Sequence, residues 1–503
     1  MIIVILLCGI HRSADAQVPE IMPDKNVLMA AFSAEDEGAF QYPDKVFYPE
    51  TWFHFIGSNL SKEGIVADLQ AIADAGISGV QWFHGDFGEV WPGMERKIMP
   101  LGEEWKELVR FVGRKADSLG LRMTVQTCPG WSMAGGPWIK PKDAMRKLVW
   151  SRTDIPSGRL FDGRLPKGQP SDDKWRDYED ITVLAFPTPL GDSGAPLIPV
   201  VTASTDSVWK SLIEGTNEGN VILQPGTYTV DFTLPDKEVL RTLSMPPVGA
   251  LNHHLCYDPG VTIKLTAKMA SGEHKVLADA ELPMSNWQDE GSGSEMDFAC
   301  NEVYGAENYT LTFTNKYPAT LQFLKFYSAA RKNSWRGEAG WSLIAKEPYQ
   351  QHTDQNPLCF VRSEDIVVLS EKMDSDGRIT WNAPQVSSPE QKWTLLRIGH
   401  VNAGIKNSPA PPDATGWECT KLDPRGAEIQ FANYVGMLQD GPLEGKASGM
   451  LMDSWECYTQ TWTNTLLDDF KSLAGYDLSN RLPALMGYVI DSQEETSRFL
   501  IDW

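Results

Sequence analysis

Positive charge is scarce in this 503-residue sequence. Lys and Arg total 45 against 67 Asp and Glu, which gives a formal net charge of -22. A surface that binds nucleic acid needs cationic side chains to neutralise phosphates. The charge balance therefore argues strongly against nucleic acid as the partner and favours a neutral or cationic one.

Long hydrophobic runs are also missing. A membrane-spanning helix needs about 20 apolar residues, and the apolar stretch within residues 1–16 is shorter than that. Ala14 and Ala16 have the A-x-A spacing of a signal-peptide cleavage site. We therefore expect residues 1–16 to be a signal peptide and the protein to be periplasmic or extracellular, with no membrane span. Lipid attachment at Cys8 is the less favoured alternative, because Leu7 stands where a lipobox has a small residue.

The seven cysteines lack any metal-binding pattern. None forms a Cys-x-x-Cys pair or stands at the Cys/His spacing of a zinc site. A structural zinc site is therefore not expected. Export would permit disulfides, but the sequence does not fix their pairing.

Strands and helices alternate in the first third of the chain, judged from the period of the apolar residues and from the glycines that follow each run. We expect strands at 52–56, 77–84 and 121–127. We expect helices at 61–76, 103–120 and 142–150. This order predicts βα units on a parallel sheet.

The pattern changes between Thr153 and about Gln391. Short alternating runs such as "GTYTVDFTL" and "VTIKLTAKM" are separated there by Pro, Gly, Asp and Asn, which predicts an inserted all-β sandwich. The first pattern then resumes, with strands expected at 392–400 and 449–453 and helices within 425–438 and 463–477. The last of these helices has Leu466, Leu467, Phe470 and Leu473 on one side.

An interrupted βα series predicts an α/β fold, namely a (β/α)8 TIM-type barrel that carries an inserted sandwich-like domain. About five barrel strands are present, and the last helix begins at a capping box, Ser492 with Glu495, but reaches Trp503 without a C-cap. We therefore expect the barrel to be incomplete in this chain. The predicted domains are a signal peptide at 1–16, a lead-in at 17–44, the first part of the barrel at 45–151, the inserted domain at 152–390 and the continuation of the barrel at 391–503.

Polar and aromatic side chains follow each predicted barrel strand. Reactive groups of barrel enzymes stand at the C-terminal ends of the strands, so we expect these side chains to share one rim. In strand order they are His54, Ser58 and Asn59; His84, Asp86 and Glu89; Gln126, Cys128 and Trp131; His400, Asn402, Lys406, Glu418 and Lys421; and Asp453, Trp455 and Glu456. Each has a structural alternative: a single histidine is more often a core side chain, and Glu418 could clamp its loop.

Carboxylates beside aromatic rings indicate cleavage of a glycosidic bond. The reaction needs one carboxylic acid to protonate the leaving oxygen and a second carboxylate as nucleophile or base. Apolar walls around Glu456 would raise the pKa of its carboxyl group, which suits the acid. Calcium binding is the competing use of such oxygen ligands.

Four long motifs resemble the glycoside hydrolase family 106 α-L-rhamnosidases: "WFHFIGSNLSKEGIVADLQAIADAGISGVQWF", "CPGWSMAGGPWIKPKDAMRKLVWS", "LLRIGHVNAGIKNSPAPPDATGWECTKLDP" and "DSWECYTQTWT". The resemblance covers about 45–151 and 392–503. It implies a barrel with β-sandwich domains and an exported enzyme that removes terminal α-L-rhamnose from oligo- or polysaccharides of plant type, by inversion and with calcium assistance.

The resemblance also implies roles for individual residues. Asp453 and Glu456 match the acidic motif, with Glu456 as the general acid. The candidate substrate-binding residues are His54, His84, Trp131, His400, Lys406, Glu418, Lys421 and Trp455. The calcium ligands are not assigned. The sequence departs from the family at Trp455, where Tyr is commoner, at Thr420, where Asp is commoner, and at Cys457.

The family places the second catalytic glutamate in a later segment, beyond residue 503. We therefore expect residues 17–503 alone not to hydrolyse an aryl α-L-rhamnoside. Two other hypotheses stay open: a noncatalytic carbohydrate-binding protein, and a barrel glycosidase for another sugar, such as an α-L-fucosidase or β-galactosidase.

Overall fold

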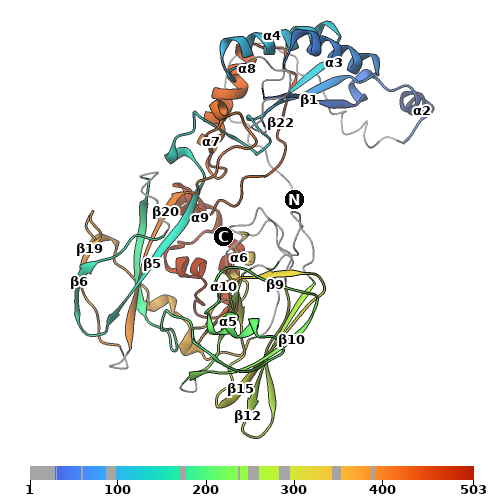
Figure 1. Ribbon diagram of the computed structural model, residues 1–503. Coiled ribbons are helices and arrows are strands. Elements are labelled where there is room, and N and C mark those ends of the chain that lie inside the picture. The colour runs from blue at the N-terminus through green and yellow to red at the C-terminus, as the bar shows by residue number, and fades with distance from the viewer. Residues whose placement is uncertain are drawn as a thin grey trace.

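The computed structural model describes residues 29, 31–57, 60–86, 98–169, 177–235, 238–246, 248, 260–282, 295–341, 353–386 and 391–503. The predicted signal peptide and the candidate residues Ser58, Asn59 and Glu89 lie outside this set. Figure 1 shows a helix-covered sheet at one end of the molecule and a larger, strand-rich part at the other. No helix in the described ranges is both long and apolar enough to cross a membrane.

The first sheet is parallel, as predicted, and has the order β1-β2-β3-β22. Its strands are β1 (Glu50–Ile56), β2 (Gly79–Gly85), β3 (Arg122–Gln126) and β22 (Gly449–Leu451). Helices α3 (Lys62–Asp74) and α4 (Glu103–Ser118) connect the first three strands. The apolar face of α4 that the sequence predicts is buried, including Trp105 and Val109. These residues share one core with Phe53, Phe55 and Trp82 of the sheet.

Three consecutive helical segments precede β22. They are α7 (Pro424–Gln430), the π-helical turn η8 (Phe431–Gly436) and α8 (Met437–Asp440). The last two of them pack on the same core, through Tyr434 and Leu438. The four strands form an open sheet within the described residues, with β1 and β22 at its edges. A closed (β/α)8 barrel therefore stays a prediction.

The strand expected at 392–400 is not part of the parallel sheet. Strand β20 (Lys392–Asn402) lies between β5 (Arg146–Pro156) and β7 (Glu179–Pro187) and is antiparallel to both, with β18 (Val367–Val368) at the edge. The prediction of a fourth barrel strand here is wrong, because both neighbours of β20 are antiparallel to it and its two faces are covered by cores of this second sheet. Leu396 and Ile398 face one of these cores, and Leu395 faces the other.

The helix predicted at 142–150 is also wrong. Only a short 3-10 turn, η2 (Pro141–Asp143), forms there, and the chain then enters β5. Arg146 to Pro156 pair with β20 over its whole length. Eleven ladder pairs and a buried face outweigh the helix propensity of "DAMRKL".

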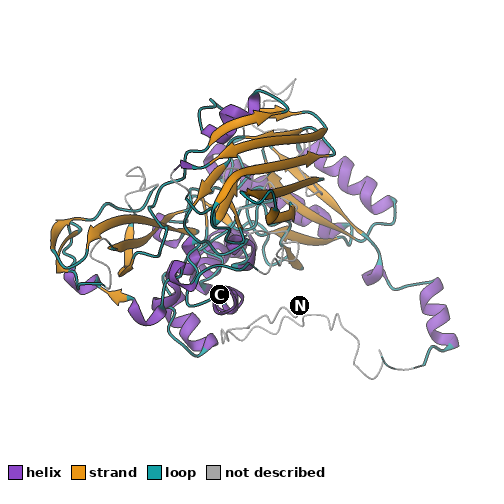
Figure 2. Ribbon diagram, turned by 90° about the horizontal axis from the view of Figure 1, so that it is seen from below, coloured by secondary structure: helices purple, strands orange, loops and turns teal. Residues whose placement is uncertain are grey.

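A β-sandwich fills most of the region between β7 and β18. Figure 2 shows the strands of this region in orange. The sheets enclose one core, to which α5 (Val208–Glu214) contributes Trp209. The larger sheet has the order β13 (His274–Glu281), β12 (Val261–Met269), β15 (Ala306–Asn315), β10 (Gly226–Thr233) and β8 (Val200–Ser204). The smaller ones are β14 (Met296–Ala299), β11 (Thr242–Met245) and β17 (Lys325–Tyr327), and β16 (Ala319–Leu321) with β9 (Val221–Leu223). The short alternating strands agree with the prediction.

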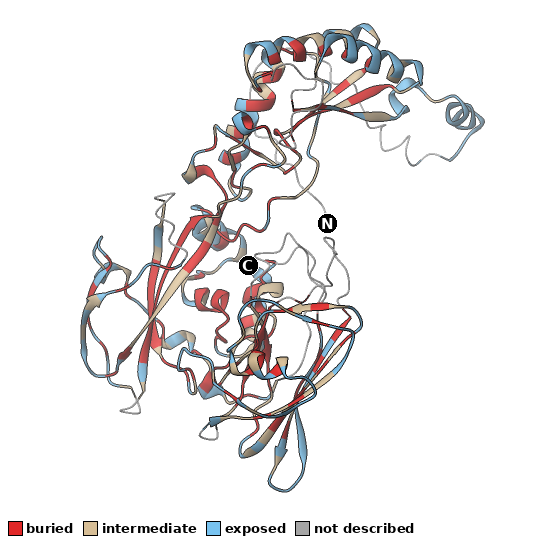
Figure 3. Cartoon of the chain, in the orientation of Figure 1, coloured by how far each residue is buried: buried red, intermediate tan, exposed pale blue. Residues whose placement is uncertain are grey.

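The last forty residues pack on the antiparallel sheet (Figure 3). Helix α9 (Leu466–Ala474) ends at Gly475, and Phe470 is its buried side chain, whereas Leu473 is 89% exposed, against the predicted apolar side. Helix α10 (Gln493–Asp502) begins at Ser492, whose hydroxyl accepts a hydrogen bond from the Glu495 amide, as the capping signal predicts. The other elements are α2 (Ala34–Gln41), α6 (Trp335–Glu338), η9 (Ser479–Met486), the pair β6 (Leu160–Arg164) and β19 (Arg378–Asn382), and the pair β4 (Gly135–Gly136) and β21 (Trp417–Glu418).

Candidate active site

Three loops meet beyond the C-terminal ends of β3 and β22: residues 127–138 after β3, 403–421 after β20 and 452–462 after β22. The Thr127 amide extends the parallel pairing by donating to the Leu451 carbonyl at 3.0 Å. The first two loops pair through β4 and β21. The second and third meet through Gln460, whose side-chain Oε1 accepts from the Lys421 backbone amide at 2.7 Å.

The first two loops approach so closely that one position requires glycine. The amides of Trp131 and Ser132 both donate to the Ser408 carbonyl, at 3.2 and 3.0 Å. Gly130 has φ +85, and a Cβ there would lie 2.7 Å from the same carbonyl oxygen. A side chain at Gly130 would therefore be strained and would also collide with backbone.

Glu456 is held by an indole from the neighbouring loop. Trp131 Nε1 donates to Glu456 Oε2 at 2.9 Å, and both side chains are half-buried. The two residues come from loops that follow adjacent strands, β3 and β22. Asp453, also half-buried, accepts a hydrogen bond from the Ser454 hydroxyl at 3.3 Å. The Trp455 indole donates to the Tyr458 carbonyl at 2.6 Å.

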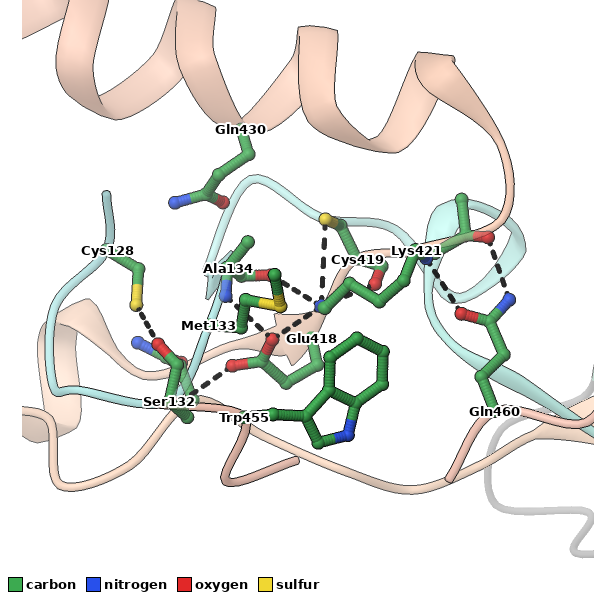
Figure 4. Close-up of polar contacts among 12 residues, drawn as sticks. Cys128, Ser132, Met133, Ala134, Glu418, Cys419, Lys421, Gln430, Trp455 and Gln460 are labelled. Carbon is green, nitrogen blue, oxygen red and sulfur yellow. Dashed lines mark hydrogen bonds and ion pairs between the residues drawn. The ribbon is translucent and has the colours of Figure 1, made fainter. Parts of the chain in front are cut away.

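A buried ion pair lies between these loops (Figure 4). Glu418 is fully buried, and its carboxylate accepts from the Ser132 hydroxyl at 2.8 Å, from the Ala134 amide at 3.0 Å and from Lys421 Nζ at 2.7 Å. Burial is the largest single effect and lowers the pKa of Lys421, but the raising effects, led by the charge of Glu418, together outweigh it, so the pKa stands above its ordinary value. These contacts fit the loop-clamp interpretation of Glu418, and its role in substrate binding stays a prediction.

Lys406 is the exposed cation of this region. Its ammonium lies 5.3 Å from the centre of the Trp417 ring, and the two residues form an isolated β-bridge. An exposed ammonium can donate to hydroxyl groups, and the indole beside it offers an apolar face. Of the candidate residues, the structure thus gathers Trp131, Lys406, Glu418, Lys421, Asp453, Trp455 and Glu456 on three adjoining loops.

The two histidines of the parallel sheet point to opposite faces. His84 packs on Trp82 and on Trp105 of α4, at ring distances of 6.2 and 4.7 Å, so it belongs to the helix-side core. Burial lowers the pKa of His84 to about 3, so the ring is neutral. His54 lies on the other face beside Trp52 and is exposed. His84 is therefore a core side chain, which is the structural alternative given for single histidines. His54 lies on the exposed face of the sheet.

His400 lies in the antiparallel sheet. Its Nδ1 accepts a hydrogen bond from Arg146 Nε, and its ring stacks on Trp462. Burial first, and the Arg146 charge second, lower the pKa of His400 to about 3. Arg146 also bonds Asp177, and its carbonyl accepts from the amides of Thr461 and Trp462. His400 and Arg146 thus anchor the end of the loop that carries Glu456.

Sequence reasoning missed Ser132, Gln460 and Arg146. Ser132 and Gln460 stand inside the motifs "CPGWSM" and "DSWECYTQTWT", but their spacing gives no sign of their partners, which lie 286 and 39 residues away. Arg146 was hidden by the helix prediction, and its charged neighbours Asp143 and Lys147 give no sign in the sequence that it is buried.

The expected calcium finds no ligand set in the part of the chain that the structure describes. No group of three or more His, Cys, Asp or Glu there is arranged to hold an ion. Glu418, the most buried carboxylate of the site, has both oxygens engaged by Ser132, Ala134 and Lys421. No described residue is therefore assigned to a metal. The five described cysteines are all free thiols.

The family model and a solved structure indicate the same family. A family model described as alpha-L-rhamnosidase matches residues 41–503. The solved structure of a rhamnosidase from Novosphingobium sp. PP1Y is similar, with a TM-score of 0.72 and 26% identity over 93% of this chain and 44% of that one. A curated protein of Formosa agariphila, named a putative beta-glucuronidase, is 25% identical over 93% of this chain and 28% of its own length. The chain thus spans less than half the length of either relative.

Proposed function

Because the chain belongs to the alpha-L-rhamnosidase family, we propose that the protein is a glycoside hydrolase that releases terminal α-L-rhamnose from plant-type glycans. The observation that carries the proposal is the carboxylate of Glu456, fixed by Trp131 at 2.9 Å where three loops meet beyond the parallel sheet. In folds built on parallel strands, this end of the sheet is the usual place of catalysis.

In the proposed reaction Glu456 is the general acid. It gives a proton to the oxygen of the leaving group as the glycosidic bond breaks, and a second carboxylate activates water on the opposite face of the sugar, which inverts the anomeric centre. Trp131 donates a hydrogen bond to Oε2 of Glu456, so Oε1 is the oxygen that carries the proton to be transferred. Asp453 is proposed as a second catalytic residue of the acidic motif, and the general base is not assigned to a described residue.

The aromatic and cationic side chains around Glu456 are the proposed sugar contacts. The faces of Trp131 and Trp455 offer stacking surface, because the polar edge of each indole is already bonded within the protein. Lys406 is exposed and offers donors to sugar hydroxyls. Export to the periplasm or the cell exterior, and assistance by calcium, also remain proposals, and no step above is routed through the ion.

A panel of aryl glycosides tests which sugar the protein releases. The whole protein is expected to turn over an aryl α-L-rhamnoside and not the matching α-L-fucoside or β-galactoside. A β-glucuronide belongs in the panel, since the Formosa agariphila relative is named a putative beta-glucuronidase. Preference for any of these other sugars would contradict the assignment of rhamnose.

The same panel separates an enzyme from a carbohydrate-binding protein. Binding of L-rhamnose by calorimetry, with no turnover of any aryl glycoside by the whole protein, would favour the noncatalytic alternative. Turnover of the aryl rhamnoside by the whole protein would favour the hydrolase.

A further inference from the structure

We propose that the buried Glu418–Lys421 ion pair positions Glu456 by fixing segment 418–421, which contacts the Trp131 loop through Glu418 and the Glu456 loop through the Lys421 backbone amide and the Thr420 hydroxyl. The geometry stands by itself, and its meaning for catalysis rests on the proposed function. Segment 418–421 lies between the loop that carries Trp131 and the loop that carries Glu456, and it bonds to both (Figure 4).

On the Trp131 side, Glu418 holds the next residues of the loop. Its Oε1 accepts from the Ser132 hydroxyl at 2.8 Å, and its Oε2 accepts from the Ala134 amide at 3.0 Å. The same Ser132 hydroxyl accepts from the Ser408 amide at 2.8 Å, and the Ser408 carbonyl accepts from the amides of Trp131 and Ser132. The backbone that carries the Trp131 indole is thus fixed on both sides.

On the Glu456 side, the segment that carries Lys421 holds Gln460. The backbone amide of Lys421 donates to Gln460 Oε1 at 2.7 Å, and Gln460 Nε2 donates to the Thr420 hydroxyl at 2.8 Å. Gln460 stands four residues after Glu456 in one short loop. Cys457, directly after Glu456, is buried, and burial raises the pKa of its thiol to about 12, so it contributes no charge.

The ion pair can hold segment 418–421 in place because the Glu418 carboxylate and the Lys421 ammonium make their hydrogen bonds to residues of the site. Lys421 Nζ bonds Glu418 at 2.7 Å, the Cys419 carbonyl at 2.7 Å and the Ala134 carbonyl at 3.3 Å. Loss of one partner would leave the other as an uncompensated buried charge, which the surrounding loops would have to rearrange to accommodate.

The consequence for Glu456 is a defined orientation of its carboxyl group. An indole N–H can only donate, so the hydrogen bond from Trp131 requires Oε2 of Glu456 to be an acceptor. A proton carried by Glu456 is thereby directed to Oε1. Loosening the ion pair should weaken this hydrogen bond even though neither of its two residues has been changed.

Nuclear magnetic resonance of the indole N–H groups tests the proposal on the 503-residue chain without substrate. The Trp131 resonance is identified by its absence in Trp131→Phe, and its hydrogen bond to Glu456 by an upfield proton shift in Glu456→Gln. Lys421→Met is expected to shift the same resonance upfield. The matched control is Lys332→Met, which breaks another buried pair, Lys332 with Glu338, whose side chains are 6% and 9% exposed.

The proposal holds if Lys421→Met moves the Trp131 resonance and Lys332→Met does not. It is overturned if Lys421→Met and Lys332→Met have the same effect on the chemical shift of the Trp131 indole proton, or if Glu456→Gln does not change that shift. Ser132→Ala removes one link of the same chain and gives the same test should Lys421→Met not fold. Absence of rhamnosidase activity would overturn the proposed function but would leave this result intact, since no substrate enters the measurement.

Discussion

Burial decides what the histidines of this protein can do. His84 follows a predicted strand as a catalytic residue would, yet its ring is 1% exposed between Trp82 and Trp105. Its pKa of about 3 keeps it uncharged at neutral pH. Glu456 and Trp131, in contrast, are half-buried and meet at the junction of two loops. At the scale of the residue, partial exposure together with a fixed orientation distinguishes the candidate catalyst.

The buried state of His84 predicts a pH dependence of stability. Its pKa of about 3 in the folded chain lies below the ordinary value of 6.5, so the unfolded chain binds a proton first as the pH falls. The free energy of unfolding should therefore decline from about pH 6.5 towards pH 3, by up to about 1.4 kcal/mol per pH unit for this group. His84→Gln should remove that part of the decline in urea titrations at several pH values.

The matched control is His274→Gln, which changes an exposed histidine of β13. It should leave the pH dependence of the parent protein unchanged. An identical pH dependence in the parent and in His84→Gln would contradict the account of His84.

At the scale of the element, local sequence patterns predicted the helices and strands correctly where one face of the element is apolar. Helices α3 and α4 and the parallel pairing of β1, β2 and β3 follow from the period of their apolar residues and from their caps. Strand β20 shows the limit of such patterns. A run buried on both faces has no period, so nothing in "WTLLRIGH" distinguishes a parallel partner from antiparallel β5 and β7.

The candidate site was predictable in part for a similar reason. Glu456 follows a strand of the parallel sheet, and its position alone indicated a site. Its partner Trp131 stands 325 residues earlier, and the Ser132 hydroxyl meets Glu418 across 286 residues. Contacts between loops at such separations depend on how the two sheets are joined, which no local pattern contains.

The meeting of two loops at Gly130 predicts a position-specific loss of stability. Gly130→Ala places a Cβ at positive φ and 2.7 Å from the Ser408 carbonyl, whereas Gly305→Ala meets the same restriction on φ, with nothing within 4 Å. We expect Gly305→Ala to cost about 1 kcal/mol and Gly130→Ala clearly more. Denaturation in urea measures both. Equal losses in the two variants would show that the loops separate freely at this point.

At the scale of the whole molecule, the candidate site lies where the chain passes between its two parts. The chain leaves the parallel sheet towards β5, returns from β20 and leaves again after β22 (Figure 1). The three passages are bonded to one another: the Ala403 amide donates to the Met145 carbonyl, and the Thr461 amide donates to the Arg146 carbonyl, at 2.8 and 3.1 Å. The two parts therefore support the loops of the site together.

The packing of the last residues strengthens this junction. Trp462 and Phe499 share one core with Leu148 and Leu396 of the antiparallel sheet. The loop that carries Glu456 is thus held at one end by β22 of the parallel sheet and at the other by the core of the antiparallel sheet. A catalytic group gains precision when rigid elements anchor both ends of its loop.

The role of Glu456 as the proton donor is the central claim, and the dependence of the rate on the leaving group tests it most directly. Hydrolysis of an alkyl α-L-rhamnoside needs a proton on the leaving oxygen. The leaving group of a dinitrophenyl rhamnoside is dinitrophenolate, which departs without a proton. In the whole protein, Glu456→Gln should lower kcat/KM for the alkyl substrate by about 10²–10⁴-fold and affect the dinitrophenyl substrate far less. An equal loss on both substrates, or no loss on either, would contradict the assignment of Glu456 as the acid.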